Sequence, residues 1–191
     1  INDVLDLSKI ESGKLKIASS TFDLYKLLEK INLTYSTIAK AKGLKFESFK
    51  SIELPRFIKS DELRIEQILN NLLNNAIKFT HIGKISLKAG LFYNREDDEN
   101  CIIEFQISDT GIGIEKDKIP QIFQKFEQGE YFLTKKYGGS GLGLSIASSL
   151  LSIMYGYIDV DTQKGEGTTF TFGMPVTKSN CDGEGEIVVD S

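Results

Sequence analysis

Several features that mark specialised classes of protein are scarce in this chain of 191 residues. Its two cysteines, Cys101 and Cys181, fit neither a disulfide framework nor a metal-binding spacing, so a reducing, cytoplasmic setting is expected. No apolar run approaches the roughly 20 residues that a membrane span needs, and no secretory signal opens the sequence. The net charge of −4 excludes a broad attraction to nucleic acid or anionic lipid.

The composition is that of an ordinary globular domain. Hydrophobic residues make up 40% of the chain and charged residues 26%, and the length allows one domain with a substantial core. The sequence begins at Ile1 without a Met, so we expect a piece of a longer protein, whose parent could carry a membrane anchor.

Hydrophobic periodicity predicts one α+β domain with two tails. We expect helices over residues 22–42, 61–79, 116–126 and 141–155, and strands over residues 44–49, 84–93, 101–108, 157–162 and 168–174. Residues 55–58 should be extended, residues 94–100 a solvated hairpin turn and residues 127–140 a loop. The Gly-rich, acidic segment from Lys178 onward predicts a linker or a disordered tail.

The helix over residues 61–79 carries amides where a core helix should carry Leu or Ile. Asn71 and Asn75 are four residues apart and share one face, although Asn disfavours helix interiors because it competes for backbone hydrogen bonds. An amide oxygen is a neutral hard ligand that suits a magnesium ion held by phosphates. Lys78 lies on the same side and can meet phosphate charge. The alternative is that both amides hydrogen-bond a neighbouring loop.

Two glycine clusters form a second signal. Residues 109–114 follow a strand, and residues 138–144 precede a helix, where free N–H groups suit phosphate. The second cluster is not a Walker A loop, because Leu144 stands where that motif needs Lys. It also lacks the third glycine and the βαβ setting of a dinucleotide fingerprint. Taken singly, each cluster is compatible with a tight turn.

Asp109 stands at the exit of a strand, immediately before the first glycine cluster. A carboxylate only accepts hydrogen bonds, so it would suit the exocyclic amine of adenine and reject a keto group. A charge-assisted bond of this kind contributes ~1.5–3 kcal/mol. The alternative is a solvated Asp in a turn.

The ordered combination of motifs resembles the catalytic, ATP-binding domain of the sensor histidine kinases. The Asn helix, Asp-x-Gly-x-Gly from Asp109, the pair Phe123 and Phe126, the cluster 138–144 and Gly-x-Gly-Thr-x-Phe at residues 165–170 match that family's N, G1, F, G2 and G3 boxes. The resemblance covers roughly residues 20–176. It implies the Bergerat ATP-binding fold, a two-layer α/β sandwich in which helices cover one face of a mixed, mainly antiparallel sheet. ATP with Mg²⁺ is expected between the helices, under a mobile lid.

The N-terminal residues 1–14 resemble the end of the second helix of the family's dimerisation and phosphoacceptor domain. We therefore expect three segments: residues 1–17 as the end of that helix and its exit, residues 18–176 as the catalytic domain and residues 177–191 as an acidic linker or tail. The phosphorylated histidine would lie upstream of Ile1. His81 has neither a helical context nor a following acid, so we expect an exposed turn residue.

The resemblance implies roles residue by residue. Asn75 and Asn71 match the metal-binding amides, Lys78 and Phe79 lie beside the phosphates and nucleotide, and Asp109 reads adenine in a pocket that Gly111 and Gly113 open. Thr168 matches a position near the base. The lid hinge and the phosphate-facing helix start match Gly139, Ser140, Gly141, Leu142 and Gly143.

The lid also implies catalytic cations. Lys135, Lys136 and Tyr137 fall late in it, and a lid cation could neutralise charge on the γ-phosphate in the transition state. Asn71, Lys78, Lys135 and Lys136 are therefore the candidate catalytic residues. Phe123 and Phe126 are expected to pack at the base of the lid.

Two other function classes compete with this interpretation. Gyrase, mismatch-repair proteins and heat-shock chaperones use the same nucleotide fold to hydrolyse ATP, with a Glu that activates water. Asn71 stands at that position and cannot take a proton, which favours transfer to a histidine. The third class is a degenerate, non-catalytic scaffold, against which the intact Asn75, Asp109 and glycines count.

The resemblance also implies partners. These are the phosphoacceptor and dimerisation domain of the same kinase and a response-regulator receiver domain, with no nucleic acid. The parent protein is expected to be a homodimer and this fragment a monomer. The acidic tail could lead to a receiver domain, as in hybrid kinases, or be a plain terminus.

Overall fold

The computed structural model describes residues 8–10, 12–94, 99–122 and 142–180. Its elements are β1 (Ser20–Asp23), α2 (Leu24–Ala41), β2 (Lys45–Lys50), β3 (Phe57–Ser60), α3 (Glu62–Phe79), β4 (Lys84–Asn94), β5 (Asn100–Asp109), the 3₁₀ turn η1 (Lys116–Lys118), α4 (Ile119–Ile122), α6 (Gly143–Ile153), β6 (Tyr157–Gln163) and β7 (Gly167–Ser179).

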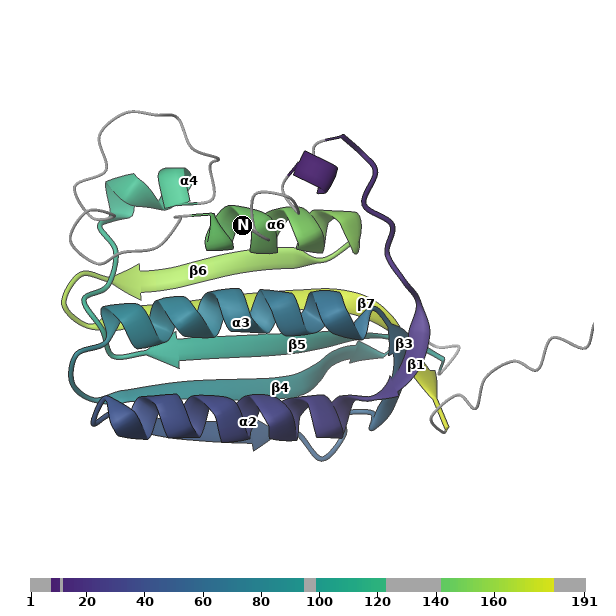
Figure 1. Ribbon diagram of the computed structural model, residues 1–191, viewed down its shortest axis with the longest axis horizontal. Coiled ribbons are helices and arrows are strands. Elements are labelled where there is room, and N and C mark those ends of the chain that lie inside the picture. Colours follow the sequence, from purple (N-terminus) through teal and green to yellow (C-terminus); the bar gives the residue numbers. More distant parts are fainter. Residues whose placement is uncertain (1–7, 11, 95–98, 123–141, 181–191) are drawn as a thin grey trace, which may run out of the picture.

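The strands form one mixed sheet. Its order is β1-β3-β7-β5-β4-β2, and β6 pairs with the first half of β7 (Figure 1). All described pairs are antiparallel except β2 with β4. The register places Asp109, the last residue of β5, opposite Thr168 of β7. Two predicted site residues from distant parts of the sequence are therefore neighbours at one end of the sheet.

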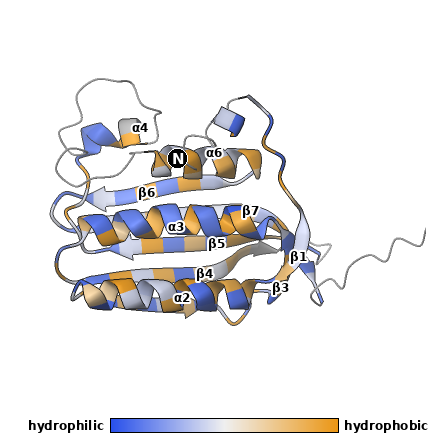
Figure 2. Ribbon diagram, in the orientation of Figure 1, coloured by the Kyte–Doolittle hydropathy of each residue, from blue (hydrophilic) through white to orange (hydrophobic). Residues whose placement is uncertain are grey.

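Helices α2, α3 and α6 lie side by side over one face of the sheet (Figure 1). The stripe that α3 turns to the core consists of Ile65, Ile68, Leu69, Leu72, Leu73, Ala76 and Ile77. Beneath the helices, every second residue of β5 is buried, and Phe105 stacks on Phe172 of β7 with ring centroids 4.9 Å apart. Figure 2 shows the resulting apolar stripes alternating with polar residues. This packing of an apolar helix stripe onto alternating strands is what the periodicity predicts.

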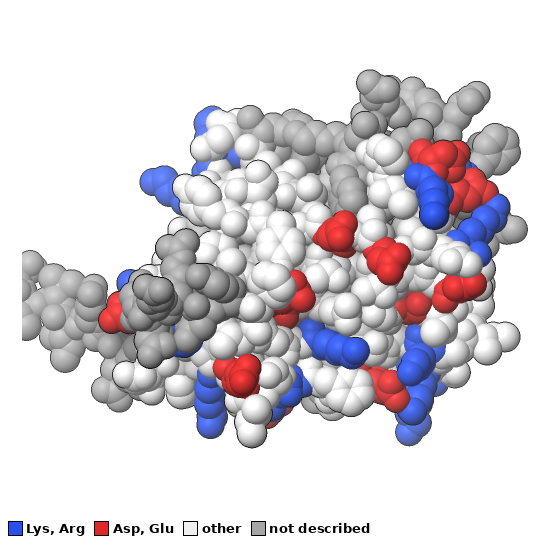
Figure 3. Space-filling view, turned by 180° about the vertical axis from the view of Figure 1, so that it is seen from behind, with Lys and Arg blue, Asp and Glu red and all other residues white. Residues whose placement is uncertain are grey.

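The face of the sheet away from the helices carries scattered charged side chains. Seen from behind, Lys and Arg side chains are interspersed with Asp and Glu, and neither sign dominates the described surface (Figure 3). This agrees with the small net charge of the sequence. Within the described part of the chain, no helix is long and apolar enough to cross a membrane.

Two buried aspartates begin the long helices. Asp23 caps α2 by accepting the N–H groups of Tyr25 and Lys26. Asp61 caps α3 through Oδ1, which accepts the Arg64 N–H at 3.1 Å, while its Oδ2 accepts the Ala18 N–H at 2.8 Å. The second bond fixes the incoming chain to the start of the helix that carries the predicted site.

The predicted fold class is confirmed, with local differences. Strand β1 was not predicted, because four residues give too short a pattern. Strand β7 continues to Ser179 and pairs with β3, so residues 177–179 belong to the sheet instead of the tail predicted from residue 177. The helix predicted over residues 116–126 starts with η1 and α4, and residues 123–126 lie outside the described part.

The double role of Asp61 can be tested by substitution. Asp61→Ala removes the cap of α3 and leaves the Ala18 N–H without its acceptor, so the free energy of unfolding should fall by about 1–2 kcal/mol. Urea denaturation measures this. Glu62→Ala is the matched control, because Glu62 is an exposed neighbour on the same helix turn. Equal effects of the two substitutions would contradict the role of Asp61.

Candidate functional site

Helix α3 carries two pairs of amides that face different neighbours. Asn70 and Asn74 turn to α2, where the Tyr35 hydroxyl lies 3.1 Å from Asn70 Oδ1 and 3.0 Å from Asn74 Oδ1. Asn71 and Asn75 are each rotated by one residue, about 100° around the helix axis. The predicted pair therefore does not share the structural contacts of its neighbours. Among the described residues, Asn75 makes no hydrogen bond to a loop of the kind that the alternative explanation requires.

Asn71 lies against the start of α6. Its Oδ1 is 3.5 Å from the position that a Cβ atom on Gly143 would occupy. Its Nδ2 is buried and makes no hydrogen bond among the described residues. A buried amide without a partner costs about 1–3 kcal/mol, so this atom has unused capacity toward a ligand or an ordered water. A side chain at residue 143 would meet this amide at ordinary van der Waals distance, so the two groups are close neighbours.

The C-terminal turn of α3 places a cation next to the amide face. Lys78 is half-buried, and its Nζ lies 4.8 Å from the centroid of the Phe79 ring. The lysine follows Asn75 by three residues, so the two side chains project from the same side of the helix. Asn71, Asn75 and Lys78 together offer neutral oxygen ligands and a positive charge along one line.

Asp109 is held at the end of β5 by backbone donors. Its Oδ1 accepts the Gly111 N–H at 2.8 Å. Burial raises the pKa of this carboxyl above its ordinary value, and the neighbouring Gly111 and Thr168 backbones and the Thr80 side chain oppose the shift. A half-buried carboxylate with one oxygen engaged can accept a hydrogen bond from a ligand through the other.

The glycines after β5 are required by close backbone contacts. A Cβ atom on Gly111 would lie 2.5 Å from the Phe79 carbonyl oxygen and 2.7 Å from Asp109 Oδ1. Gly113 has φ +63°, and a side chain at this position would clash with the Gln163 carbonyl. The Ile112 N–H also donates to the Phe79 carbonyl at 3.3 Å. These glycines therefore let the turn pack directly between α3 and the β6–β7 hairpin.

A threonine pair joins this turn to the β6–β7 hairpin. Thr162 Oγ1 accepts the Ile114 N–H at 2.9 Å and lies 3.0 Å from Thr168 Oγ1. Both threonines are buried. Gly167 has φ +121° and lies so close to the Asp109 carbonyl that a side chain would clash there. Thr168 is therefore fixed beside Asp109.

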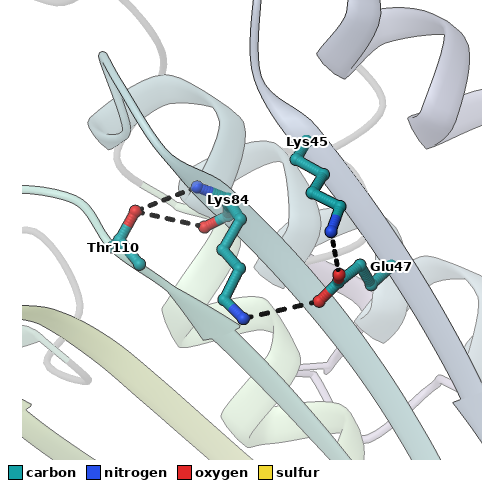
Figure 4. Close-up of polar contacts among 4 residues, drawn as sticks. All are labelled: Lys45, Glu47, Lys84 and Thr110. Carbon is teal, nitrogen blue, oxygen red and sulfur yellow. Dashed lines mark hydrogen bonds and ion pairs between the residues drawn. The ribbon is translucent and has the colours of Figure 1, made fainter.

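Thr110 connects the same turn to the loop after α3. Its Oγ1 accepts the Lys84 N–H at 3.0 Å and lies 3.4 Å from the Lys84 carbonyl oxygen (Figure 4). The Thr110 N–H donates to the same carbonyl at 3.1 Å. A side chain on Gly83 would clash with this hydroxyl. Next to it, Glu47 accepts from Lys45, at 2.6 Å, and from Lys84, which lowers the pKa of Glu47. Thr110 thus joins the turn after β5 to the loop after α3.

The structure brings most of the described predicted residues into one chain of contacts. Asn71 lies on Gly143, the end of α3 lies on Gly111, and Asp109 lies beside Thr168. Leu142 is buried and caps α6 with its backbone, where its carbonyl accepts the Ser145 hydroxyl. His81 is exposed in the turn between α3 and β4, as expected. The predicted residues that lie outside the described part are Phe123, Phe126, Lys135, Lys136, Tyr137, Gly139, Ser140 and Gly141.

Other polar residues of the site were missed by the sequence reasoning. These are Tyr35, Asn70, Asn74, Thr80, Thr110 and Thr162. The doubled spacing of the amides, at residues 70 and 74 as well as 71 and 75, was the one available signal, because it marks two helix faces. The threonines gave none, since their partners lie far away in the sequence.

The residues present fit a nucleotide with its metal. The orphaned Asn71 amide can bind a ligand, and Asp109 offers a half-buried carboxylate that the Gly111 N–H holds in place. No group of three or more His, Cys, Asp or Glu within the described ranges could hold a metal alone, so a cation here would rely on amides and phosphates. A surface hollow among Ser148, Ser152, Tyr155 and Tyr157 lies toward the other end of α6 and contains none of the predicted residues.

Comparison with known proteins gives a consistent answer. Residues 60–178 match the model of the family described as "Histidine kinase-, DNA gyrase B-, and HSP90-like ATPase". The autoinducer 2 sensor kinase/phosphatase LuxQ of Vibrio vulnificus (strain YJ016) is 40% identical over 182 residues, which cover 95% of this chain and 21% of LuxQ. Hybrid signal transduction histidine kinase L of Dictyostelium discoideum is 41% identical over 172 residues, covering 90% of this chain and 10% of that protein.

A solved structure supports the same conclusion. Full-length ShkA in complex with AMPPNP superimposes with a TM-score of 0.78 at 31% identity, over 95% of this chain and 36% of that one. The chain thus spans about a fifth of the length of LuxQ and a third of that of ShkA. The fold and the family predicted from the ordered motifs are both confirmed. The chain belongs to the family of histidine kinase-, DNA gyrase B- and HSP90-like ATPases.

Proposed function

We propose that this chain is the catalytic domain of a sensor histidine kinase, which binds Mg²⁺-ATP and transfers the γ-phosphoryl group to a histidine of the kinase's phosphoacceptor domain. The observation that carries the proposal is the carboxylate of Asp109, which Gly111 holds in place next to the helix α3 that carries the amides. We assign the base site to the C-terminal end of α3, beside Phe79, and the phosphate site to the face that carries Asn71, Asn75 and Lys78.

Asp109 supplies recognition of the base. Its carboxylate accepts the exocyclic amine of adenine and rejects the keto oxygen of guanine, which offers no proton. Gly111 keeps a side chain away from this carboxylate, because a Cβ atom there would lie 2.7 Å from Asp109 Oδ1. Thr168 and the hairpin behind it hold the pocket wall in place.

We assign the phosphates to the residues of α3 that precede its C-terminal end. Asn75, with Asn71 beside it, would hold Mg²⁺ through amide oxygens, and Lys78 would neutralise phosphate charge. When bound, Mg²⁺ offsets the negative charge that builds up on the phosphates. We assign Leu142 and Gly143 to the phosphate-facing start of α6, where backbone N–H groups are free of a side-chain cap. Lys135 and Lys136 remain the proposed lid cations.

The transfer itself needs little covalent chemistry from this chain. An imidazole nitrogen of the acceptor histidine attacks the γ-phosphorus, the bond to the β–γ bridging oxygen breaks, and ADP leaves with that electron pair. The proton of the attacked imidazole passes to solvent or to a base on the phosphoacceptor domain. Asn71 cannot accept a proton from water, which disfavours hydrolysis as the competing outcome. The domain therefore acts by positioning ATP and neutralising charge.

We propose that the whole protein is a dimeric kinase of two-component signalling. LuxQ is named a sensor kinase/phosphatase, and the Dictyostelium relative is named a hybrid kinase. We infer that residues 8–17 continue from the phosphoacceptor domain, with Leu15 and Ile17 packed against the catalytic core. A response-regulator receiver domain would take the phosphoryl group in the next step. A cytoplasmic setting follows from the need for ATP.

The metal role of Asn75 can be separated from helix packing. Asn75→Ala should reduce ADP affinity by about tenfold or more with Mg²⁺ present and change it little with EDTA, because an amide ligand is lost. Isothermal titration calorimetry in the two conditions measures this. Asn74→Ala is the matched control, since Asn74 bonds Tyr35 on the other side of the same helix. An equal loss with and without Mg²⁺ would show a structural role instead.

The base-reading role of Asp109 predicts opposite changes in affinity and stability. Asp109→Asn should weaken ADP binding by about tenfold or more, because a mixed donor and acceptor replaces a charged acceptor. The unliganded variant should be at least as stable as the parent at pH 7. The folded-state pKa of Asp109 is raised, so ionisation costs stability as the pH rises through that pKa and costs nothing well below the ordinary value of 3.8.

Calorimetry and urea denaturation at pH 7 and pH 3 test this pair of changes. Asp159→Asn serves as the control, because Asp159 is exposed on β6. Unchanged ADP affinity in the Asp109 variant would remove Asp109 from the base site.

Phosphoryl transfer should require a second domain. This chain with γ-labelled ATP and Mg²⁺ should gain no label, because its own histidine, His81, lies in an exposed turn. Adding the phosphoacceptor domain of a related histidine kinase should give an acid-labile label on that domain only. Label on this chain alone, or rapid release of phosphate without the second domain, would contradict the assignment in favour of hydrolysis or another acceptor.

A further inference from the structure

Thr80 is a buried hydroxyl that the proposed function does not yet use. It ends α3, where its N–H donates to the Ala76 carbonyl at 3.1 Å. The residue is 1% exposed, and its Oγ1 makes no hydrogen bond of normal geometry among the described residues. Asn71 Nδ2 is the other buried side-chain atom of the described part in this condition. Both orphaned atoms thus belong to the helix that borders the proposed nucleotide site.

The packing at the end of α3 places Thr80 against Asp109. The Phe79 carbonyl oxygen and Asp109 Oδ1 both lie within 2.7 Å of one point, the position of a Cβ atom on Gly111. Thr80 is the next residue after Phe79. Its hydroxyl is also one of the groups that lower the pKa of Asp109, together with the Gly111 and Thr168 N–H groups and against the larger, raising effect of burial. No charged side chain contributes to this pKa in the described part of the chain.

We infer that Thr80 is a positioning residue for adenine recognition, whose hydroxyl donates to the Asp109 carboxylate and orients it toward the exocyclic amine of the base. The inference rests on the proposed function, since it assumes that Asp109 reads adenine. It assigns Thr80 no contact with the phosphates or the acceptor histidine.

The geometry explains why a third donor is needed. Gly111 holds only Oδ1 of Asp109, so the carboxylate could still rotate about its Cβ–Cγ bond or take up a proton in its buried place. A hydroxyl can rotate to donate to the carboxylate as the base arrives, and hydrogen bonds in binding sites often tighten only in the complex. Because Oγ1 has no other hydrogen-bond partner among the described residues, its donor is available to the carboxylate.

The test compares three variants by ADP calorimetry with Mg²⁺ between pH 5 and pH 8. Thr80→Val keeps the shape and removes the hydroxyl, and it should weaken ADP binding by about tenfold at pH 7. As the pH is lowered, the ADP affinity of this variant should begin to fall at a higher pH than the ADP affinity of the parent. The reason is that the Asp109 carboxyl loses a donor that favours its ionised form. Thr80→Ser restores the hydroxyl and should restore both properties.

Thr177→Val is the matched control, because it also removes a threonine hydroxyl from a partly buried site, where Thr177 bonds Asn100. Titration of the nucleotide is common to all proteins, so the ratio of each variant's affinity to the parent's isolates the protein group. Should Thr80→Val not fold, as judged by its thermal midpoint, Thr80→Ala carries the same pH comparison.

Each outcome decides between distinct conclusions. A parent protein that does not bind ADP would overturn the proposed function itself. A parent that binds ADP, with Thr80→Val showing the same affinity and pH profile, would overturn only the role of Thr80. A loss of affinity that is equal at every pH, or one that Thr80→Ser does not rescue, would show that Thr80 is merely structural.

Discussion

The contact between the end of α3 and the turn after β5 is the constraint on which the candidate site depends. The Phe79 carbonyl approaches Gly111 so closely that any side chain there would collide with it. This approach joins the helix with the amide face to the strand end with the carboxylate, although the two are separated by β4 in sequence. A larger residue at position 111 would push the two halves of the site apart, so the glycine couples fold to function.

The same contact carries an energetic conflict. Asp109 is placed where burial disfavours its charge, and no described cation compensates for it. The carboxylate depends on neutral donors: backbone N–H groups and, by inference, the Thr80 hydroxyl. Neutral donors leave the negative charge available to a ligand, whereas a lysine or arginine would satisfy it permanently. Burial of the Asp109 charge therefore lowers the stability of the free protein, and a hydrogen bond from the adenine amine would offset this cost in the proposed site.

Sequence reasoning predicted the fold, and it selected several residues that the structure brings together, because local rules and the folded structure agree there. The amphipathic stripe of α3, the alternation of β5 and the glycines beside Asp109 each follow from period or backbone geometry. It could not reach contacts that only tertiary packing creates. Tyr35 meets Asn70 and Asn74 from 35 and 39 residues away, and Thr162 meets Ile114 across 48 residues. Strand β1 is too short to have a period of its own.

The run of amides in α3 has a meaning that neither the sequence nor a single pair reveals. Two adjacent residues on a helix point about 100° apart, so a doubled pair serves two faces at once. Asn70 and Asn74 bind the Tyr35 hydroxyl and hold α3 against α2, while Asn71 faces the start of α6 with an amide nitrogen left unpaired. Hydrogen bonds on one face thus oppose rotation of the helix and keep the other face directed at the proposed phosphate site. Poor helix formers are tolerated in this helix because one pair secures the position in which the other pair can bind.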